Sequence, residues 1–186
     1  MIFIVLLVIL GLAALVPILI YNSLISKKNQ VDNIFASLDA LLKKRFDLIP
    51  NLVAGVQQYM KHERETLTQV TDLRTRAMSA TTDHEKAEVD RALTGALRGL
   101  MVSVENYPDL KASQNFLQLQ ASLNETEEQI SAGRRAYNST VTDLNNAIEM
   151  FPTNIFAGMM SLKKRELFIV PEEQRKNVDV KKLFNS

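Results

Sequence analysis

The first twenty-one residues of the chain carry no charged side chain. The run Ile2–Ile20 is almost wholly apolar and is interrupted only by Gly11 and Pro17. A helix rises about 1.5 Å per residue, so about 20 such residues span the hydrocarbon core of a bilayer, which is about 30 Å thick. The sequence therefore predicts one transmembrane helix that anchors the chain through residues 1–21.

Two other interpretations of this segment fit less well. A cleaved signal peptide begins with basic residues and ends at a small-residue cleavage site, but the first basic residue is Lys27 and the segment Tyr21–Leu24 fits a cleavage site poorly. A buried core helix would be shorter and would carry polar residues on at least one face. Pro17 is compatible with a spanning helix, so we expect an uncleaved single span.

Basic residues close to a span set its orientation, because they remain on the cytoplasmic side. The N-terminal side offers only the terminal amine, whereas Lys27 and Lys28 follow the apolar run and a basic segment at 43–45 lies further along. We therefore expect the N-terminus outside, the main domain in the cytoplasm, and the two lysines at the membrane interface. The absence of cysteine is consistent with a reducing compartment.

The rest of the chain, about 165 residues, is long enough for one domain with its own core. It contains all 22 basic and 21 acidic residues, which gives a net charge of +1. Such a balance gives no reason to expect a nucleic-acid partner. The whole chain has six glycines and five prolines, so few residues interrupt helices and long helices are favoured.

Apolar residues recur at intervals of three and four, the spacing of one helical face, in four segments of this domain. The first continues from the span to Ile49, where Pro50 should end it and begin the second. The capping box Thr82–Glu85 should open the third helix, which a turn at 106–109 closes. The fourth, at about 113–151, carries a coiled-coil-like heptad seam. We expect an all-α fold without a sheet, an antiparallel four-helix bundle over residues 22–151.

Two charged residues interrupt the seam of the fourth helix. Glu127 and Arg134 lie one heptad apart at positions that should face the other helices. An unpaired buried charge costs several kcal/mol, so each needs a partner, and Arg45, Glu63 and Arg74 are the candidates. We expect this polar seam to be a structural network that fixes helix register. The alternative is a pocket for a ligand or a partner.

Three further residues of the fourth helix are candidate contact residues. Tyr137 falls in the seam and is expected in the core. Asn138 and Asn145 share one face, one heptad apart. Their spacing is consistent with hydrogen bonds between helices or with an exposed contact strip, and the sequence leaves both possibilities open.

The segment 152–186 reads as a short amphipathic stretch followed by a basic tail. In an up-down bundle the fourth helix returns to the membrane, so Phe151 should lie near the bilayer. The apolar stretch Ile155–Leu162 precedes Lys163, Lys164 and Arg165, a combination that suits the interface of an anionic membrane. The alternative is that this stretch caps the open end of the bundle.

No catalytic, cofactor or metal site is expected. Neither His62 nor His84 follows a glutamate by three residues, as the inward ligands of di-iron bundles do. There is no cysteine, no Gly-x-Ser-x-Gly sequence and no glycine-rich phosphate loop. Because no acid, base and nucleophile can be assembled, we expect a protein that is not an enzyme.

Two groups of motifs resemble the LemA family, and with the N-terminal span and the Tyr21-Asn22 that follows it the resemblance covers nearly the whole chain. The first is Lys44-Arg45-Phe46-Asp47-Leu48-Ile49-Pro50-Asn51-Leu52-Val53 with Tyr59 and His62-Glu63, and the second is Tyr107-Pro108-Asp109-Leu110-Lys111, Phe116-Leu117-Gln118-Leu119-Gln120, Glu127, Arg135-Ala136-Tyr137-Asn138, Asn145 and Phe151-Pro152. The resemblance implies a bacterial membrane protein with a helical-bundle domain and an N-terminus outside the cell, and it implies no reaction. The tail after Phe151-Pro152 departs from the pattern of the family.

Two functions follow as expectations. The first is a membrane-anchored adaptor or scaffold on the cytoplasmic face of the inner membrane, which presents a rigid helical surface to another membrane-associated protein or to copies of itself. The second is a membrane-shaping or lipid-surface-binding protein, for which the span and the basic tail provide two points of attachment to the bilayer.

Overall fold

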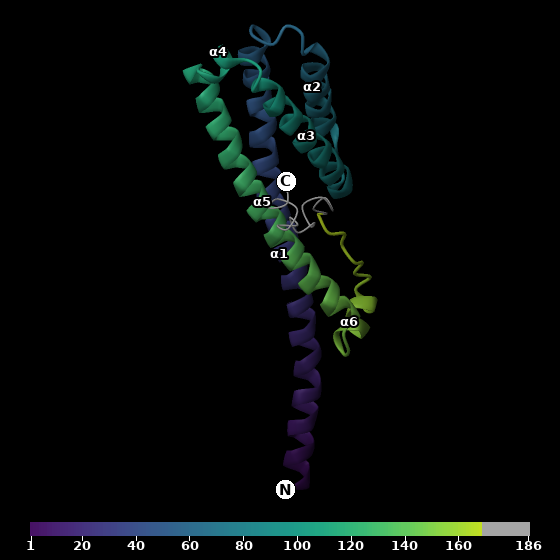
Figure 1. Ribbon diagram of the computed structural model, residues 1–186. Coiled ribbons are helices and arrows are strands. Elements are labelled where there is room, and N and C mark those ends of the chain that lie inside the picture. The colour runs from purple at the N-terminus through teal and green to yellow at the C-terminus, as the bar shows by residue number, and fades with distance from the viewer. Residues whose placement is uncertain (169–186) are drawn as a thin grey trace, which may run out of the picture.

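The computed structural model describes the backbone of residues 1–168 and their side chains except those of residues 5 and 7–14. Within this range every regular element is a helix, so the all-α prediction is confirmed. The last part of the predicted basic tail, residues 169–186, lies outside the described residues. The helices are α1 (Ile2–Gln57), α2 (Arg64–Ser79), α3 (Asp83–Val104), α4 (Pro108–Lys111), α5 (Gln114–Glu149) and α6 (Thr153–Met159) (Figure 1).

Helix α1 is a rod of 56 residues, about 84 Å long at the rise of an α-helix. The predicted break at Pro50 is wrong, because α1 continues through this residue to Gln57. A proline inside a helix costs about 3 kcal/mol. Its neighbours Ile49 and Leu52 are each at most 1% exposed in the core, while Pro50 itself faces solvent. Burial of these side chains holds the helical course where the local preference alone would end it.

A second correction concerns the start of α2, which begins at Arg64 rather than at Pro50. The carbonyl of Val56 accepts hydrogen bonds from the amides of Tyr59 and Met60, at 3.0 and 2.9 Å, and these turn the chain after α1. Met60 is fully buried within the turn. The buried Met60 side chain therefore attaches the turn between α1 and α2 to the end of the hydrophobic core.

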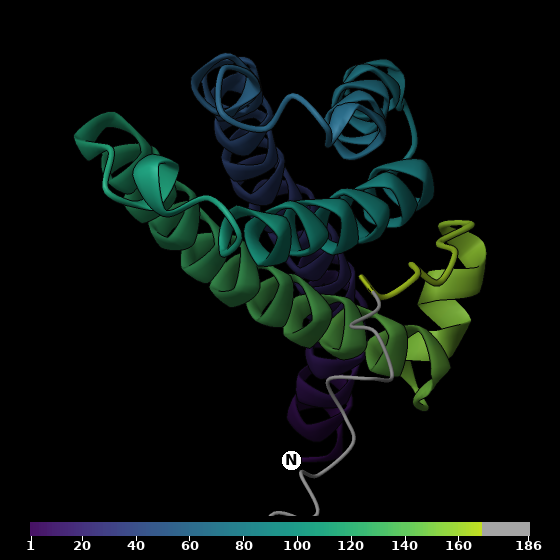
Figure 2. The same cartoon turned by 45° about the horizontal axis from the view of Figure 1, so that its top comes forward.

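Helices α1 and α5 lie side by side and run in opposite directions in both views (Figures 1 and 2). Apart from the charged residues Arg45, Glu127 and Arg134, their shared seam is apolar, with Gly133 of α5 against Leu38 of α1. A Cβ atom at position 133 would lie 3.1 Å from Leu38 Cδ1, so any larger residue there would require Leu38 to shift by a few tenths of an ångström. The fully buried seam residues include Leu24, Val31, Leu38 and Leu42 of α1 and Ile130, Tyr137, Val141 and Leu144 of α5.

Helices α2 and α3 form a hairpin that packs against the far part of α1 (Figure 2). The predicted capping box opens α3: the Glu85 amide donates to Thr82 Oγ1 and the Thr82 amide donates to Glu85 Oε2, both at 3.1 Å. These hydrogen bonds lower the pKa of the Glu85 carboxyl. The predicted turn at 106–109 leads directly into the one-turn helix α4.

The regular four-helix bundle is not confirmed. Helices α2 and α3 have 16 and 22 residues, far fewer than the 56 of α1 and the 36 of α5. What the structure has in common with such a bundle is the long antiparallel pair of α1 and α5. The α2–α3 hairpin packs against one end of this pair. Among the described residues, no helical stretch combines the length and apolar character that crossing a membrane requires.

At the other end of the long pair, α5 stops at Glu149 and the chain turns into α6, which contacts both α5 and α1. After α6 the chain reverses and runs back beside α5 without regular secondary structure over residues 162–168 (Figure 1). We call residues 163–168 the strap. Its position brings the C-terminal segment against the middle of the helical domain.

Candidate functional site: a buried ion network and a clamped strap

Asp90 of α3 is the centre of a buried ion network. Its carboxylate is 1% exposed and accepts from Arg45 Nη2 at one oxygen and from Arg134 Nη2 at the other. Arg45 comes from α1 and is 1% exposed, and Arg134 comes from α5. The three side chains therefore join three helices at one buried point.

Glu127 of α5 closes the network into a ring. Arg45 Nη1 lies 2.6 Å from Glu127 Oε2, and Arg134 Nη1 lies 3.5 Å from Glu127 Oε1. Arg45 Nη1 also donates to Thr94 Oγ1 at 3.0 Å. Two guanidinium groups and two carboxylates balance one another, so the ring has no formal net charge.

The buried position has an electrostatic cost. Burial raises the pKa of the Asp90 carboxyl, an effect that Arg45 and Arg134 partly oppose. The Nε atoms of both arginines are buried without an acceptor in the part of the chain that the structure describes. Because two of its buried donors lack an acceptor, the ring is only weak evidence for a gain in stability, and a role in fixing helix register stays a prediction.

A second site lies beside the ring, where α5 holds the strap. Asn138 and Asn145 are the holding residues. Asn138 donates to the Phe168 carbonyl at 2.9 Å and accepts from the Phe168 amide at 2.7 Å. Asn145 binds Arg165 in the same way, at 2.8 and 2.9 Å. Each asparagine thus satisfies both peptide groups of one strap residue.

The spacing of these contacts follows from backbone geometry. Seven helical residues advance about 10.5 Å, and three extended residues advance about 10 Å. One heptad of α5, from Asn138 to Asn145, therefore matches the step from Phe168 back to Arg165. This match fixes the strap antiparallel to α5, in a single register.

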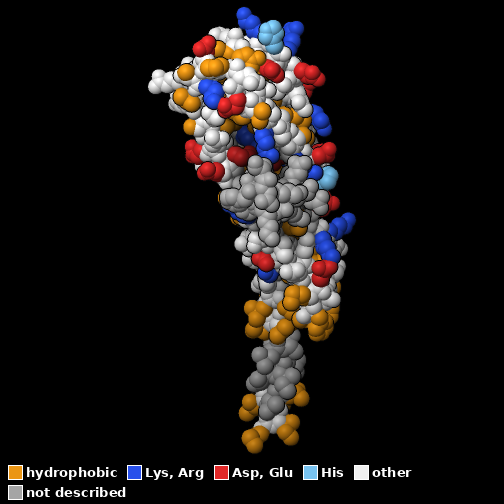
Figure 3. All heavy atoms as spheres, viewed as in Figure 1, with side chains coloured by type: hydrophobic (Ala, Val, Ile, Leu, Met, Phe, Trp, Pro, Cys, Tyr) orange, Lys and Arg blue, Asp and Glu red, His pale blue; other side chains and the backbone are white. Residues whose placement is uncertain are grey.

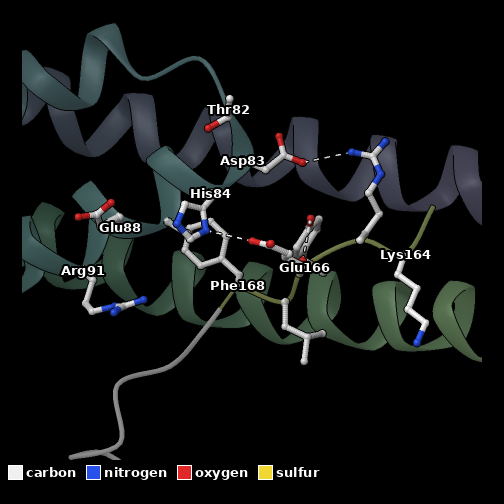
Figure 4. A pocket seen from close by; sticks show the side chains of 12 residues that line it. Thr82, Asp83, His84, Glu88, Arg91, Lys164, Glu166 and Phe168 are labelled. Carbon is white, nitrogen blue, oxygen red and sulfur yellow. Dashed lines mark hydrogen bonds and ion pairs between the residues drawn. The ribbon is translucent and has the colours of Figure 1, made fainter.

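Two strap side chains are bound by the domain. The Phe168 ring is 3% exposed and packs edge-on against Tyr137, with ring centroids 6.3 Å apart. Arg134 Cζ lies 5.8 Å from the centre of the Phe168 ring, so the aromatic residue also covers one arginine of the ion ring. Figure 4 shows Phe168 close to His84 in the first turn of α3, and the strap, the start of α3 and Tyr137 together line one pocket.

The other bound side chain is Arg165. Its Nη2 donates to Asp32 of α1 at 2.8 Å, and its Nη1 donates to Asp83 of α3 at 3.4 Å. Glu166 instead faces outward and contacts His84 Nδ1 at 3.0 Å (Figure 4). The strap therefore connects α1, α3 and α5 at a level different from that of the ion ring.

Tyr137 joins the two sites. Its ring lies between Phe35 and Phe168, at 5.5 and 6.3 Å between centroids, and its hydroxyl donates to the Glu166 carbonyl at 3.4 Å. Burial, together with Asp83, raises the pKa of Tyr137 to about 12. The hydroxyl consequently stays protonated as a donor at any physiological pH.

The predicted polar seam residues are only partly assembled. The structure brings Arg45, Glu127 and Arg134 together, whereas Glu63 lies directly before α2 and outside the ring. Arg74, another candidate partner, donates its Nε to the Phe46 carbonyl at 2.9 Å. Sequence reasoning missed Asp90, although a signal existed: it follows Val89 and precedes Leu93 by three, on the buried face of α3.

The predicted membrane-interface residues differ in exposure and in pairing. Lys163 and Lys164 are exposed, and Lys164 pairs with Glu149. Lys27 and Lys28 are half-buried on α1. Arg165 pairs with Asp32 and Asp83, and its side chain is 39% exposed. Within residues 1–168, no group of three His, Asp or Glu side chains is placed to hold a metal ion.

Comparison with known proteins gives a consistent family assignment. The profile of the LemA family matches residues 34–181. Protein LemA of Metamycoplasma hominis is 30% identical over 165 residues, which is 88% of this chain and 75% of that protein. Magnetosome protein MamQ 1 of Paramagnetospirillum magneticum is 32% identical over 79 residues, 42% of this chain and 29% of that protein, and MamQ of Magnetospirillum gryphiswaldense is 29% identical over the same shares. The profile covers most of the helical domain and the strap, and the chain belongs to the LemA family.

Proposed function

We propose that this protein is a non-enzymatic adaptor that residues 1–21 anchor in the bacterial inner membrane, with its N-terminus outside and its helical domain at the cytoplasmic face. The uncharged start of the chain and the lysines at 27 and 28 support this topology. Its partner is another membrane-associated protein or a second copy of the chain. The bilayer is a second binding partner.

The observation that carries the proposal is an apolar surface at one end of the molecule. On α6 and the turn before it, large apolar side chains are exposed beside the equally exposed apolar side chains of α1, as Figure 3 shows at that end. The exposed residues are Leu15, Val16, Ile18, Leu19 and Tyr21 on α1 and Met150, Phe151, Ile155 and Met159 around α6.

Such a surface is costly in water and is typical of an interaction site. Phe151 is 80% exposed and Met159 is 79% exposed. If this segment capped the open end of the helical domain, these apolar side chains would be buried. Two exposed lysines, Lys163 and Lys164, follow at once. Apolar anchors with adjacent basic residues match the headgroup region of an anionic bilayer, so the observation favours membrane contact over capping.

The adaptor part of the proposal follows from the rod. From Tyr21 to Gln57, α1 extends about 54 Å at 1.5 Å per residue. The α2–α3 hairpin packs on its far part, so a partner bound there is held at a fixed distance from the membrane. The ion ring supports this rigidity, because it joins α1, α3 and α5.

A depth measurement tests the membrane contact. The chain has no cysteine, so Ile155→Cys and Leu117→Cys each introduce one site for a nitroxide label. Both native side chains are exposed, by 53% and 50%, but Leu117 lies at the opposite end of α5. In vesicles of anionic lipid holding the full chain, we expect oxygen to relax the first label and a water-soluble nickel complex to relax the second. Water-like accessibility at both sites would overturn the membrane contact.

The second candidate function, membrane shaping, is favoured by the same apolar end, since side chains inserted in one leaflet beside a span act as a wedge. Crosslinking and mass spectrometry of native membranes should recover one dominant partner if the adaptor function is right. Deformation of pure lipid vesicles by the full chain, lost in Phe151→Asp, would instead support shaping. The Val102→Asp variant is the matched control, because Val102 is equally an exposed apolar residue but lies on α3.

A further inference from the structure

We call the surface that holds the strap the groove: it consists of Asn138 and Asn145 of α5, with Asp32 of α1 and Asp83 of α3 beside them. The groove binds peptide main chain. The four hydrogen bonds from Asn138 and Asn145 are made with the amide and carbonyl groups of Arg165 and Phe168. Such bonds form with any extended segment in the right register, whichever molecule supplies it. The groove is thus a built peptide site that the chain's own strap occupies.

Side-chain recognition adds a simple pattern. A guanidinium lies between Asp32 and Asp83, and an aromatic ring three residues later packs against Tyr137. The residues between them are poorly constrained, since the Glu166 side chain is 79% exposed and Leu167 is 47% exposed. The bound chemistry is therefore an extended Arg-x-x-Phe segment, which this chain itself carries at 165–168.

The connection between α6 and the strap contains a strained residue. Ser161 has a φ of 53°, in the left-handed region that favours glycine. Its amide donates to the Gly158 carbonyl, and the Leu162 amide donates to the Ala157 carbonyl, each at 3.0 Å. This is a Schellman cap with serine where glycine is usual. Short connections under strain favour exchange of the following segment between molecules.

We propose that the groove binds the Arg-x-x-Phe strap of a second copy of this chain, so that copies associate by exchanging straps. The inference rests on the proposed function in one respect: a shared anchor holds all copies in the same orientation, with their grooves at one height above the membrane. Straightening of the chain at Ser161 releases the strap from its own groove. The contacts of the exchanged strap are the same as those seen within one molecule.

Two substitutions of Ser161 shift the equilibrium between the strap bound in its own groove and the exchanged strap, in opposite directions. Ser161→Pro fixes φ near −65° and removes the amide that donates to Gly158, so the cap cannot form and the strap must leave its own groove. Ser161→Gly accepts the positive φ without strain and keeps the strap in place. A left-handed non-glycine residue is disfavoured by roughly tenfold, which sets the scale of the expected effect.

The test uses full-length chains in detergent, so its result does not depend on contact with a bilayer. His84 and Glu166 contact each other across the groove at 3.0 Å, and the native chain has no cysteine. One population carries His84→Cys and another carries Glu166→Cys, both in the Ser161→Pro background. A short bismaleimide then joins the two chains only where the strap of one lies in the groove of the other.

We expect a crosslinked dimer in the Ser161→Pro mixture, with at most about one tenth as much in the Ser161→Gly mixture. Adding Asn138→Ala and Asn145→Ala to the chain with His84→Cys should abolish it, with helix content unchanged by circular dichroism. A single chain with both cysteines and Ser161→Gly should crosslink internally, which verifies the reach of the reagent. Absence of the dimer, or its persistence without the two asparagines, would overturn strap exchange and leave the membrane proposal to its own depth test.

Discussion

Asn145 and Arg165 are joined by a pair of hydrogen bonds, at 2.8 and 2.9 Å, in which one side-chain amide satisfies both peptide groups of one strap residue. Asn138 does the same for Phe168 one heptad earlier on α5. Helix α5 thereby has two roles, since one face packs against α1 and the adjacent edge holds a peptide. The predictions below separate the contributions of strap, ion ring and helix contact.

The first prediction concerns the strap. Asn145→Ala removes both hydrogen bonds to Arg165, and each is worth about 1 kcal/mol, so amide exchange in residues 163–168 should accelerate by about tenfold or more. Hydrogen–deuterium exchange with mass spectrometry measures this directly. Asn146→Ala is the control, because Asn146 is the exposed neighbour on the same helix. Equal acceleration in both variants would mean that the asparagine contact does not hold the strap.

The second prediction concerns the ion ring. Asp90→Ala leaves two arginines without their shared buried carboxylate, and we expect the free energy of unfolding to fall by about 3–5 kcal/mol. Glu88→Ala, an exposed acidic residue of α3, should change it by less than about 0.5 kcal/mol. Chemical denaturation of the full chain in mild detergent measures both. A small effect of Asp90→Ala would show that water or the surrounding helices relax to solvate the arginines.

A second variant of the same ring separates its effect on the free energy of unfolding from its effect on helix register. Joint replacement by apolar residues of similar size, Arg45→Met, Asp90→Leu and Arg134→Met, removes every buried charge except the partly exposed Glu127. We expect most of the lost stability to return, because apolar packing replaces desolvated ions. If the ring fixes helix register, this variant should give a broader distribution of label-to-label distances between α3 and α5 than the native chain.

The third prediction is a pH dependence. The folded-state pKa of Tyr137 is about 12, against about 10 in an unfolded chain. Between these values the folded state keeps a proton that the unfolded state loses, so the free energy of unfolding falls as the pH rises from about 10 toward 12. Tyr137→Phe should remove this part of the slope. Denaturant midpoints measured across the alkaline range give the dependence of the free energy of unfolding on pH. The same dependence in the native chain and in Tyr137→Phe would contradict the prediction.

The fourth prediction concerns the close approach of the two long helices. Gly133→Val places a branched side chain where even a Cβ lies 3.1 Å from Leu38, and we expect destabilisation of about 1–3 kcal/mol. Leu38→Ala in the same chain should recover part of the loss by making room. Gly99→Ala is the control, because a Cβ there meets nothing within 4 Å, and helix propensity should stabilise the chain by about 0.5–1 kcal/mol. Thermal unfolding that ranks the two glycine variants in the opposite order would contradict the close contact.

Sequence patterns anticipated features with a fixed local period. The capping box at Thr82 and the charged heptad positions Glu127 and Arg134 were readable, because helical spacing alone decides which side chains share a face. Asp90 was not singled out, since its neighbours Glu88 and Arg91 make it resemble any surface acid of a charged helix. The helical spacing from Asp90 to Leu93 places it on the apolar face of α3, but the two arginines that neutralise it come from α1 and α5 and are brought to it only by the folded chain.

Two other features were missed for related reasons. The course of α1 through Pro50 is decided by the burial of Ile49 and Leu52, a tertiary effect that opposes the local preference of proline. The strap has no periodicity at all, so nothing in the residues 163–168 themselves indicates that they pack on α5. The asparagine pair carried a signal, one heptad spacing on a shared face, but its partner could come only from the folded chain.

The membrane contact of α6 is the central element of the functional proposal, and one measurement tests it most directly. The chain has no tryptophan, so Met159→Trp introduces a single indole at a side chain that is 79% exposed. With the full chain in vesicles whose lipid acyl chains carry bromine, this indole should be strongly quenched, whereas that of Val102→Trp, a 67% exposed position on α3, should not. Equal, weak quenching in both variants would contradict the proposal.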